Sequence, residues 1–177
     1  MIYYSSPFST ERKIGKAYNQ FMKLLPNPTD YGCLIDGDTL FTTSNYGYLI
    51  EAVVNQNPNC RLFYAKTNRI SCPWQLDNAI AGDDIFLHRQ HGKQLMDLHG
   101  TAVKQVQGES VPGSGFFILL RKCLWEKFPF REDGMLNVDW DFFRRVVRSK
   151  EIVFQISGLY LYHWYRGGDS RDTTHLE

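Results

Sequence analysis

The chain has 177 residues, of which 43% are hydrophobic and 22% charged, as is typical of one globular domain with its own core. Its formal net charge of +1 provides no overall attraction to nucleic acid or to an anionic membrane, so neither class of binding protein is favoured. Recognition must then come from a local site. We expect residues 1–175 to form a single domain, and we interpret residues 176–177 as a cloning scar.

The cysteines and the apolar segments indicate the compartment. No C-x-x-C pair is present, which favours free, buried thiols in a reducing environment. The first residues lack the pattern of a signal peptide. The longest apolar run, Phe116 to Leu120, is too short to span a bilayer. The sequence therefore predicts a cytoplasmic protein, with peripheral contact to a membrane or to a partner protein left open.

The first part of the chain alternates strand-like and helical patterns. Tyr31 to Asp36 is continuously apolar up to its last residue, which favours a strand buried on both faces, as in a parallel sheet. The expected elements are a strand at 1–7, a helix from about 10 to 25 capped by Ser9 or Thr10, a strand at 31–36, a helix at 45–55 and a strand at 60–67.

The second part contains more varied elements. The expected elements are a helix at 83–97, a strand at 101–107, a loop at 108–115, a strand or helix start at 116–122, a helix at 137–149 and closing strands at 151–157 and 159–165. The combined order predicts an α/β fold, a three-layer αβα sandwich around a mostly parallel mixed sheet. Ligands in such sheets bind beyond the carboxyl ends of the strands.

Asp36, Gly37 and Asp38 lie at such a strand end. Two adjacent carboxylates repel each other, and a divalent cation with a preference for oxygen ligands, Mg²⁺ or Mn²⁺, would relieve that repulsion. We expect Gly37 to allow a tight bend that brings both side chains to one ion. The alternative is a turn with solvated aspartates, because Asp-Gly is common in turns.

Two motifs, with the segments around them, resemble family 2 glycosyltransferases of the GT-A fold over residues 10 to 165. In that family a helix with an Ala-x-Asn motif precedes a strand that ends in D-x-D, and an acidic motif with a trailing arginine follows later. The matching residues here are Ala17, Asn19, Asp36 and Asp38, then Asp139, Asp141 and Arg145, while Val138 replaces the leading glutamate of the second motif.

The resemblance implies transfer of a sugar from a nucleotide-sugar donor to a hydroxyl of a saccharide or other acceptor, with Mn²⁺ or Mg²⁺. Asp38 would bind the metal, and Asp36 the metal or the donor ribose. Asp139 would be the general base of an inverting reaction. Asp141 and Arg145 would pair one helical turn apart and support that base.

Further residues could complete such a site. The resemblance places His163 near the metal or the diphosphate, and Arg166 could bind phosphate. Ser114, in a glycine-rich loop, could receive sugar hydroxyls or phosphate oxygens. For His163 a purely structural role is the alternative. For the pair His88 and His91, a solvated helix face is favoured over a metal site.

The chain differs from the family at its start, because only 35 residues precede Asp36 and the usual second and third strands are missing. Three explanations stay open. The enzyme could be compact, with Tyr4, Ser6 and Arg12 contacting the base of the donor. It could need a partner chain. It could instead be a non-catalytic module that binds sugars or nucleotides. A different phosphate-handling enzyme is a further alternative.

Overall fold

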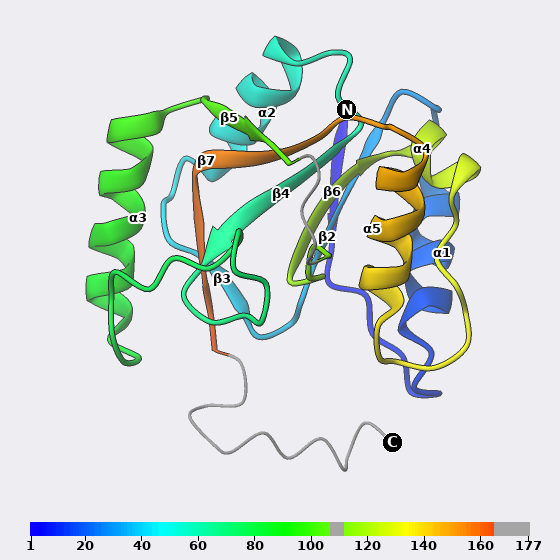
Figure 1. The fold of residues 1–177 in the computed structure, drawn as a ribbon, viewed down its shortest axis with the longest axis horizontal. Coiled ribbons are helices and arrows are strands. Elements are labelled where there is room, and N and C mark those ends of the chain that lie inside the picture. The colour runs from blue at the N-terminus through cyan, green and yellow to red at the C-terminus, as the bar shows by residue number, and fades with distance from the viewer. Residues whose placement is uncertain (107–111, 165–177) are drawn as a thin grey trace.

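The computed structural model describes residues 1–106 and 112–164, which form one sheet with helices around it (Figure 1). The strands are β1 (Ile2–Ser5), β2 (Tyr31–Ile35), β3 (Thr39–Phe41), β4 (Leu62–Thr67), β5 (Val103–Gln105), β6 (Phe117–Arg121) and β7 (Val153–His163). The helices are α1 (Ile14–Leu24), α2 (Tyr46–Gln56), α3 (Ile85–His99), α4 (Lys122–Lys127) and α5 (Val138–Arg148).

The sheet is mixed and has the order β1-β2-β6-β4-β7-β3, with β5 also paired to β7. The α/β class expected from the sequence is confirmed. The expected parallel majority is wrong for the described strands, because only β1–β2 and β4–β7 are parallel pairs. Strand β6 lies between β2 and β4 and runs antiparallel to both, and β3 and β5 run antiparallel to β7.

Strand β7 curls the sheet. The sequence predicts two closing strands here, but the structure has one strand of 11 residues. Its first half pairs with β5 and its end pairs with β3. Strand β4 pairs with both halves, with a shift of register between Tyr64 and Lys66. Figure 1 shows the resulting bend in β7. The bend brings the last residues of β7 beside the short strand β3.

Apolar side chains cover both faces of the sheet. In β2, Leu34 belongs to one core cluster and Cys33 to the other, as alternation along a strand requires. Helices α1, α4 and α5 pack in the first cluster and α2 in the second, while α3 lies along β7. The expected burial of β2 on both faces is confirmed, and it accounts for its continuous apolar sequence.

Helix α1 holds the segment that leads into α5. Asn19 is 3% exposed, and its amide donates to the Phe130 carbonyl at 2.8 Å and to Glu132. Its Oδ1 accepts from Trp125 Nε1 and from the Phe130 N–H. The backbone of α1 at Gly15 also lies against this segment, since a Cβ on Gly15 would be 1.8 Å from the Arg131 carbonyl oxygen. Asn19 of the sequence motif is therefore a fully bonded tether.

Replacing this tether is expected to destabilise the fold. Asn19→Ala leaves the Trp125 N–H and the Phe130 N–H and carbonyl buried without partners, so the free energy of unfolding should fall by about 3 kcal/mol. Urea denaturation measures this. The neighbouring exposed residue provides the control, because Gln20→Ala should change the free energy by less than about 0.5 kcal/mol. Equal effects of both variants would contradict the tether.

Several local expectations are corrected. Helix α1 begins at Ile14 with Lys13 as its N-cap residue, although Ser9 Oγ does accept a hydrogen bond from the Lys13 N–H at 2.9 Å. Strand β3 was not expected, because three residues carry too weak a pattern. The cysteines are free, as expected: Cys33, Cys60 and Cys72 are buried and Cys123 is partly buried.

His88 and His91 do not lie on a solvated helix face. His88 is fully buried, and its ring nitrogens lie 3.0 Å from the Gly82 carbonyl and 2.7 Å from the Tyr160 hydroxyl. Because a carbonyl only accepts, Nε2 of His88 donates to Gly82 and Nδ1 accepts from Tyr160. His91 lies 3.0 Å from Asp77. These polar contacts fasten α3 to the sheet beside β7.

Within residues 1–106 and 112–164, no helix has the length and the apolar character that a bilayer crossing requires.

Candidate functional site

The turn between β2 and β3 carries the two motif aspartates. Asp36 directly follows β2 and Asp38 directly precedes β3. The turn is closed by a hydrogen bond from the Thr39 N–H to the Asp36 carbonyl at 3.1 Å. Contrary to the expectation, the backbone does not require a glycine at position 37, because the φ of Gly37 is not positive. A Cβ there would make only an ordinary contact with Ser6 Oγ at 3.5 Å.

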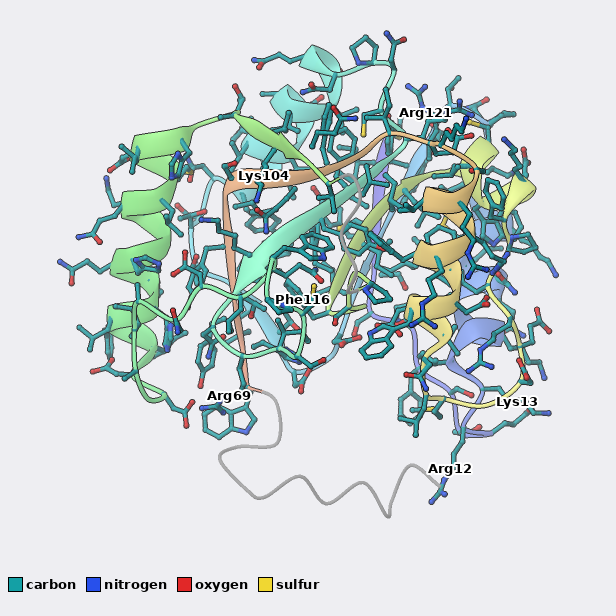
Figure 2. All side chains as sticks on the ribbon, in the orientation of Figure 1. Arg12, Lys13, Arg69, Lys104, Phe116 and Arg121 are labelled. Atoms are coloured by element: carbon teal, nitrogen blue, oxygen red, sulfur yellow. The ribbon has the colours of Figure 1, made fainter. Side chains whose placement is uncertain are left out.

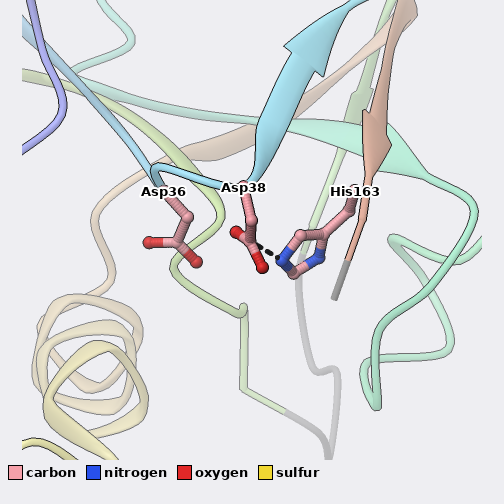
Figure 3. A group of neighbouring side chains, drawn as sticks. All are labelled: Asp36, Asp38 and His163. Atoms are coloured by element: carbon pink, nitrogen blue, oxygen red, sulfur yellow. Dashed lines mark ion pairs between the residues drawn. The ribbon is translucent and has the colours of Figure 1, made fainter. Parts of the chain in front are cut away.

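The pairing of β3 with β7 brings His163 to this turn. Thr39 lies opposite His163 in the register, and the Trp164 N–H donates to the Asp38 carbonyl at 2.9 Å. His163 Nε2 then lies 3.2 Å from Asp38 Oδ1. One ligand atom each from Asp36, Asp38 and His163 lie within 4.8 Å of one another, as Figure 3 shows. The structure thus brings together the three residues expected to bind metal.

The hydrogen bonds of His163 fit a cation site. Its Nδ1 lies 3.0 Å from the Arg69 carbonyl oxygen, which can only accept, so Nδ1 carries a proton. In the neutral ring, Nε2 then presents a lone pair towards the Asp38 carboxylate. Two acceptors face each other there, and either a second ring proton or a cation removes the conflict. A backbone carbonyl on the far nitrogen is a common support for histidine ligands.

The carboxylates of the turn have different electrostatic environments. Burial raises the pKa of Asp36 to about 6, and the charges of Asp38 and Asp139 add to the increase while His163 opposes it. When Nε2 of His163 also carries a proton, its hydrogen bond to Asp38 lowers the pKa of that carboxyl. Two charged carboxylates in one partly buried site are costly without a positive partner. Imidazole is a better ligand for Mn²⁺ than for Mg²⁺. The set of two carboxylates and one imidazole therefore favours Mn²⁺.

Removing the Asp36 charge is expected to stabilise the metal-free protein. The folded pKa of about 6 exceeds the ordinary 3.8, so the wild type loses stability as pH rises from about 4 to 6, and the loss persists above that range. Asp36→Asn should therefore raise the free energy of unfolding at pH 7 by up to about 3 kcal/mol.

Urea denaturation in EDTA across pH 3.5 to 7.5, about the range in which the carboxyl titrates, measures this difference. The gain should nearly vanish at the acid end, where the carboxyl is mostly protonated in both states. Asp97→Asn, an exposed carboxylate paired with Lys93, is the control and should change little at any pH. A difference that stays constant with pH would contradict the assigned cause.

A cleft of about 550 Å³ joins this cluster to the start of α5. Asp139, the second residue of α5, lines the cleft and is fixed from two sides. The Gly115 N–H donates to its Oδ2 at 2.7 Å, and the Trp140 N–H donates to its Oδ1 at 2.9 Å. Burial raises the pKa of Asp139, although these two N–H groups oppose the change. A carboxylate that is oriented and made more basic in this way can accept a proton from a bound ligand.

Asp141 and Arg145 lie outside the cleft. They pair within α5 at 2.8 Å, which confirms the expected contact one helical turn apart. Arg145 also donates to the Pro129 carbonyl at 2.7 Å. These contacts bind the helix to the segment before it, so the two side chains act on the orientation of α5 and do not reach the cleft.

Ser114 lines the cleft and is 4% exposed. Two N–H groups of this loop are already bonded within the protein. The Ser114 N–H donates to Gln75 at 2.6 Å, and the Gly115 N–H donates to Asp139. Ser114, Gly115 and Phe116 all belong to the described lining of the cleft.

Arg12 and Tyr4, two of the residues proposed to contact the donor base, do not line the cleft. Arg12 is exposed with a left-handed backbone, φ 55°, and Figure 2 shows it pointing away from the sheet. It is absent from the described cleft lining. Tyr4 lines a different cavity. Arg166, like the suggested scar at 176–177, lies outside the described residues.

Sequence patterns missed other residues of the cleft. Tyr18, which lies in the expected helix at 10–25 between Ala17 and Asn19 of the motif, is buried and lines the cleft together with Asp36 and Asp139. Asn137 lines it with a left-handed backbone, φ 59°, a conformation that Asn tolerates better than most residues. The motif of Ala17, Tyr18 and Asn19 pointed to Tyr18 in the sequence. Only the packing of α1 shows that the residue lies at the cleft.

The cleft is acidic. Three carboxylates line it, and no lysine or arginine belongs to its described lining. A diphosphate would be repelled by these carboxylates unless a cation were bound with it. Nucleotide binding by the described residues should therefore depend strictly on metal.

Comparison with known families found no matching family model, and comparison with curated proteins found no significant match. The function is therefore inferred from the residues and geometry of the cleft.

Proposed function

We propose that this chain is a metal-dependent glycosyltransferase that transfers a sugar from a nucleotide-sugar donor to an acceptor hydroxyl. One observation carries the proposal. A single cleft is lined by the cluster of Asp36, Asp38 and His163 and by the oriented, partly buried Asp139. Its volume is within the range of about 300–1,000 Å³ usual for small-molecule sites.

Each residue has a defined part in the proposed reaction. Asp36, Asp38 and His163 would hold Mn²⁺ or Mg²⁺, which when bound would offset the negative charge of the donor diphosphate. Asp139 accepts the proton of the acceptor hydroxyl while the oxygen of that hydroxyl bonds to the anomeric carbon of the donor sugar. The bond from that carbon to the diphosphate breaks, and the nucleoside diphosphate leaves with the bonding electrons. A single displacement of this kind inverts the anomeric centre.

Gly115 and Trp140 support this role, because their N–H groups fix the Asp139 carboxylate before substrate binds. Preorganisation of this kind reduces the cost of reaching the reactive geometry. Arg145 and Asp141 stabilise the helix that carries the base.

We also propose that the fold is a shortened GT-A arrangement, with the curled sheet as the middle of three layers. The helices packed on both faces of the sheet support this assignment. The acidic cluster beyond the carboxyl end of the buried strand β2 supports it as well.

The test separates binding from turnover. The melting temperature is measured with UDP, GDP and their sugar conjugates, with Mn²⁺ and with EDTA. We expect a nucleotide to stabilise the chain only with metal. Release of nucleoside diphosphate is then measured with a panel of mono- and disaccharide acceptors, and we expect it to need metal, donor and acceptor together.

Three outcomes are distinct. Metal-dependent nucleotide binding without turnover on any acceptor would instead support the non-catalytic binding module. Stabilisation by nucleotide that is equal in EDTA would contradict the metal-dependent site. No binding of metal or of nucleotide would overturn the proposal entirely.

A further inference from the structure

A second cavity lies at the opposite end of β2 from the cleft. Its volume is about 670 Å³, and it lies between the edge strand β1, the first residue of β2 and helix α2. Tyr31 lines this cavity at the start of β2, whereas Asp36 follows the end of the strand. Five residues of extended chain separate the two places by roughly 17 Å, so the cavity is a separate site.

Aromatic rings form the walls of this cavity, which include Tyr4, Tyr31, Tyr46 and Tyr48. Tyr46 is stacked on Phe41 with 3.7 Å between ring centroids, and Tyr4 packs edge-on against Tyr46 at 6.2 Å. These contacts fix the rings in place. Yet Tyr48 is 80% exposed and Tyr4 42% exposed, so apolar ring surface remains available to a ligand.

The polar groups of the cavity balance in charge. Glu51 and Arg121 are its two charged side chains, and the Met1 amino group at its edge is paired with Asp30 at 2.9 Å. The guanidinium of Arg121 lies 5.0 Å from the centre of the Tyr31 ring. Its buried Nε has no hydrogen-bond partner among the described residues. Hydroxyl and amide groups complete the lining, from Thr29, Ser44 and Asn55.

We infer that this cavity is a binding site for a neutral saccharide. A sugar ring has an apolar face of C–H groups and a rim of hydroxyls, so it can lie on a tyrosine ring while its rim bonds to polar side chains. The opposite charges of Glu51 and Arg121 in the lining leave no excess of positive charge for a phosphate or a nucleotide. The carboxylate can accept from hydroxyls and the guanidinium can donate to them.

Amide chemical shifts of the ¹⁵N-labelled chain test this inference. Maltose, cellobiose, lactose and N,N′-diacetylchitobiose are titrated separately in metal-free buffer. We expect at least one of them to shift amides of residues 2–5 and 46–55. Tyr48→Ala should weaken this binding about tenfold, whereas Tyr48→Phe, which keeps the ring, should weaken it less than about threefold.

Phe86→Ala is the matched control. Phe86 is an exposed aromatic residue at 76% exposure on α3, outside this cavity, so its removal should leave binding unchanged. The inference is overturned if none of the four sugars shifts the amides of β1 and α2, if shifts occur only around the cleft, or if Tyr48→Ala binds like the wild type. The test uses no donor and no metal, so its result is independent of the proposed transfer reaction.

Discussion

Asp139→Asn is expected to lower the rate of sugar transfer by about 10³-fold, within the range of 10²–10⁴ that general-base catalysis contributes. The substituted amide cannot take the acceptor proton. Its oxygen can still accept from the Gly115 N–H, which now holds Oδ2 at 2.7 Å, so the fold and the affinity for nucleotide should be retained. Initial rates at saturating donor and acceptor measure the loss, and nucleotide titration checks the affinity.

The pH profile gives an independent readout of the same residue. Burial raises the pKa of Asp139 above its ordinary value, so the group stays protonated, and inactive as a base, up to a higher pH than an exposed aspartate. The transfer rate of the wild type should rise with pH through this raised pKa and then level off. In Asp139→Asn the residual rate should lose this rise.

Asp141→Asn is the matched control for Asp139. Asp141 lies two residues further along α5 and pairs with Arg145 outside the cleft. Losing one partly exposed ion pair costs little, so transfer should fall by less than about threefold. If both variants reduced transfer equally, the effect would come from the helix and Asp139 would not be the base.

Asp38→Asn should weaken Mn²⁺ binding by at least about 100-fold, because even indirect partners of metal ligands contribute about 10- to 100-fold. Asp38 is the residue of the cluster that lies 3.2 Å from His163 Nε2. Since the described lining of the cleft offers no lysine or arginine, nucleotide binding should be lost with the metal. Isothermal titration with Mn²⁺, then with nucleotide in the presence of Mn²⁺, measures both effects.

His163→Gln should reduce Mn²⁺ affinity in the same direction, because it removes the imidazole of the cluster. Asp133→Asn provides the control, since the Asp133 side chain is 78% exposed and does not belong to the described cleft lining. Wild-type Mn²⁺ affinity in Asp38→Asn would show that the cluster is not the metal site. Retained nucleotide binding without metal would contradict the electrostatic reasoning for the cleft.

The sequence alone determined the features that depend on local pattern. The continuous apolar run of β2 predicted burial on both faces, and helical spacing predicted α1, α2, α3 and α5 to within a few residues at their ends, while α4 was not separated from the strand before it. Asp36 and Asp38 were identified by residue type and by their position at a strand end, whereas Asp139 was identified through the resemblance of its motif to the family pattern. Such features follow from side-chain period and backbone preference, which neighbouring residues encode together.

Only the tertiary structure decided which of these residues meet. The register of β3 on β7 brings His163 to Asp38. The sequence predicts two separate strands in the segment of β7, so it does not predict the bend that makes this pairing possible. Packing also turned Tyr18 into the cleft and placed Tyr4 in the second cavity. Contacts between distant segments depend on strand register and side-chain direction, and a local pattern specifies neither of them across a curled sheet.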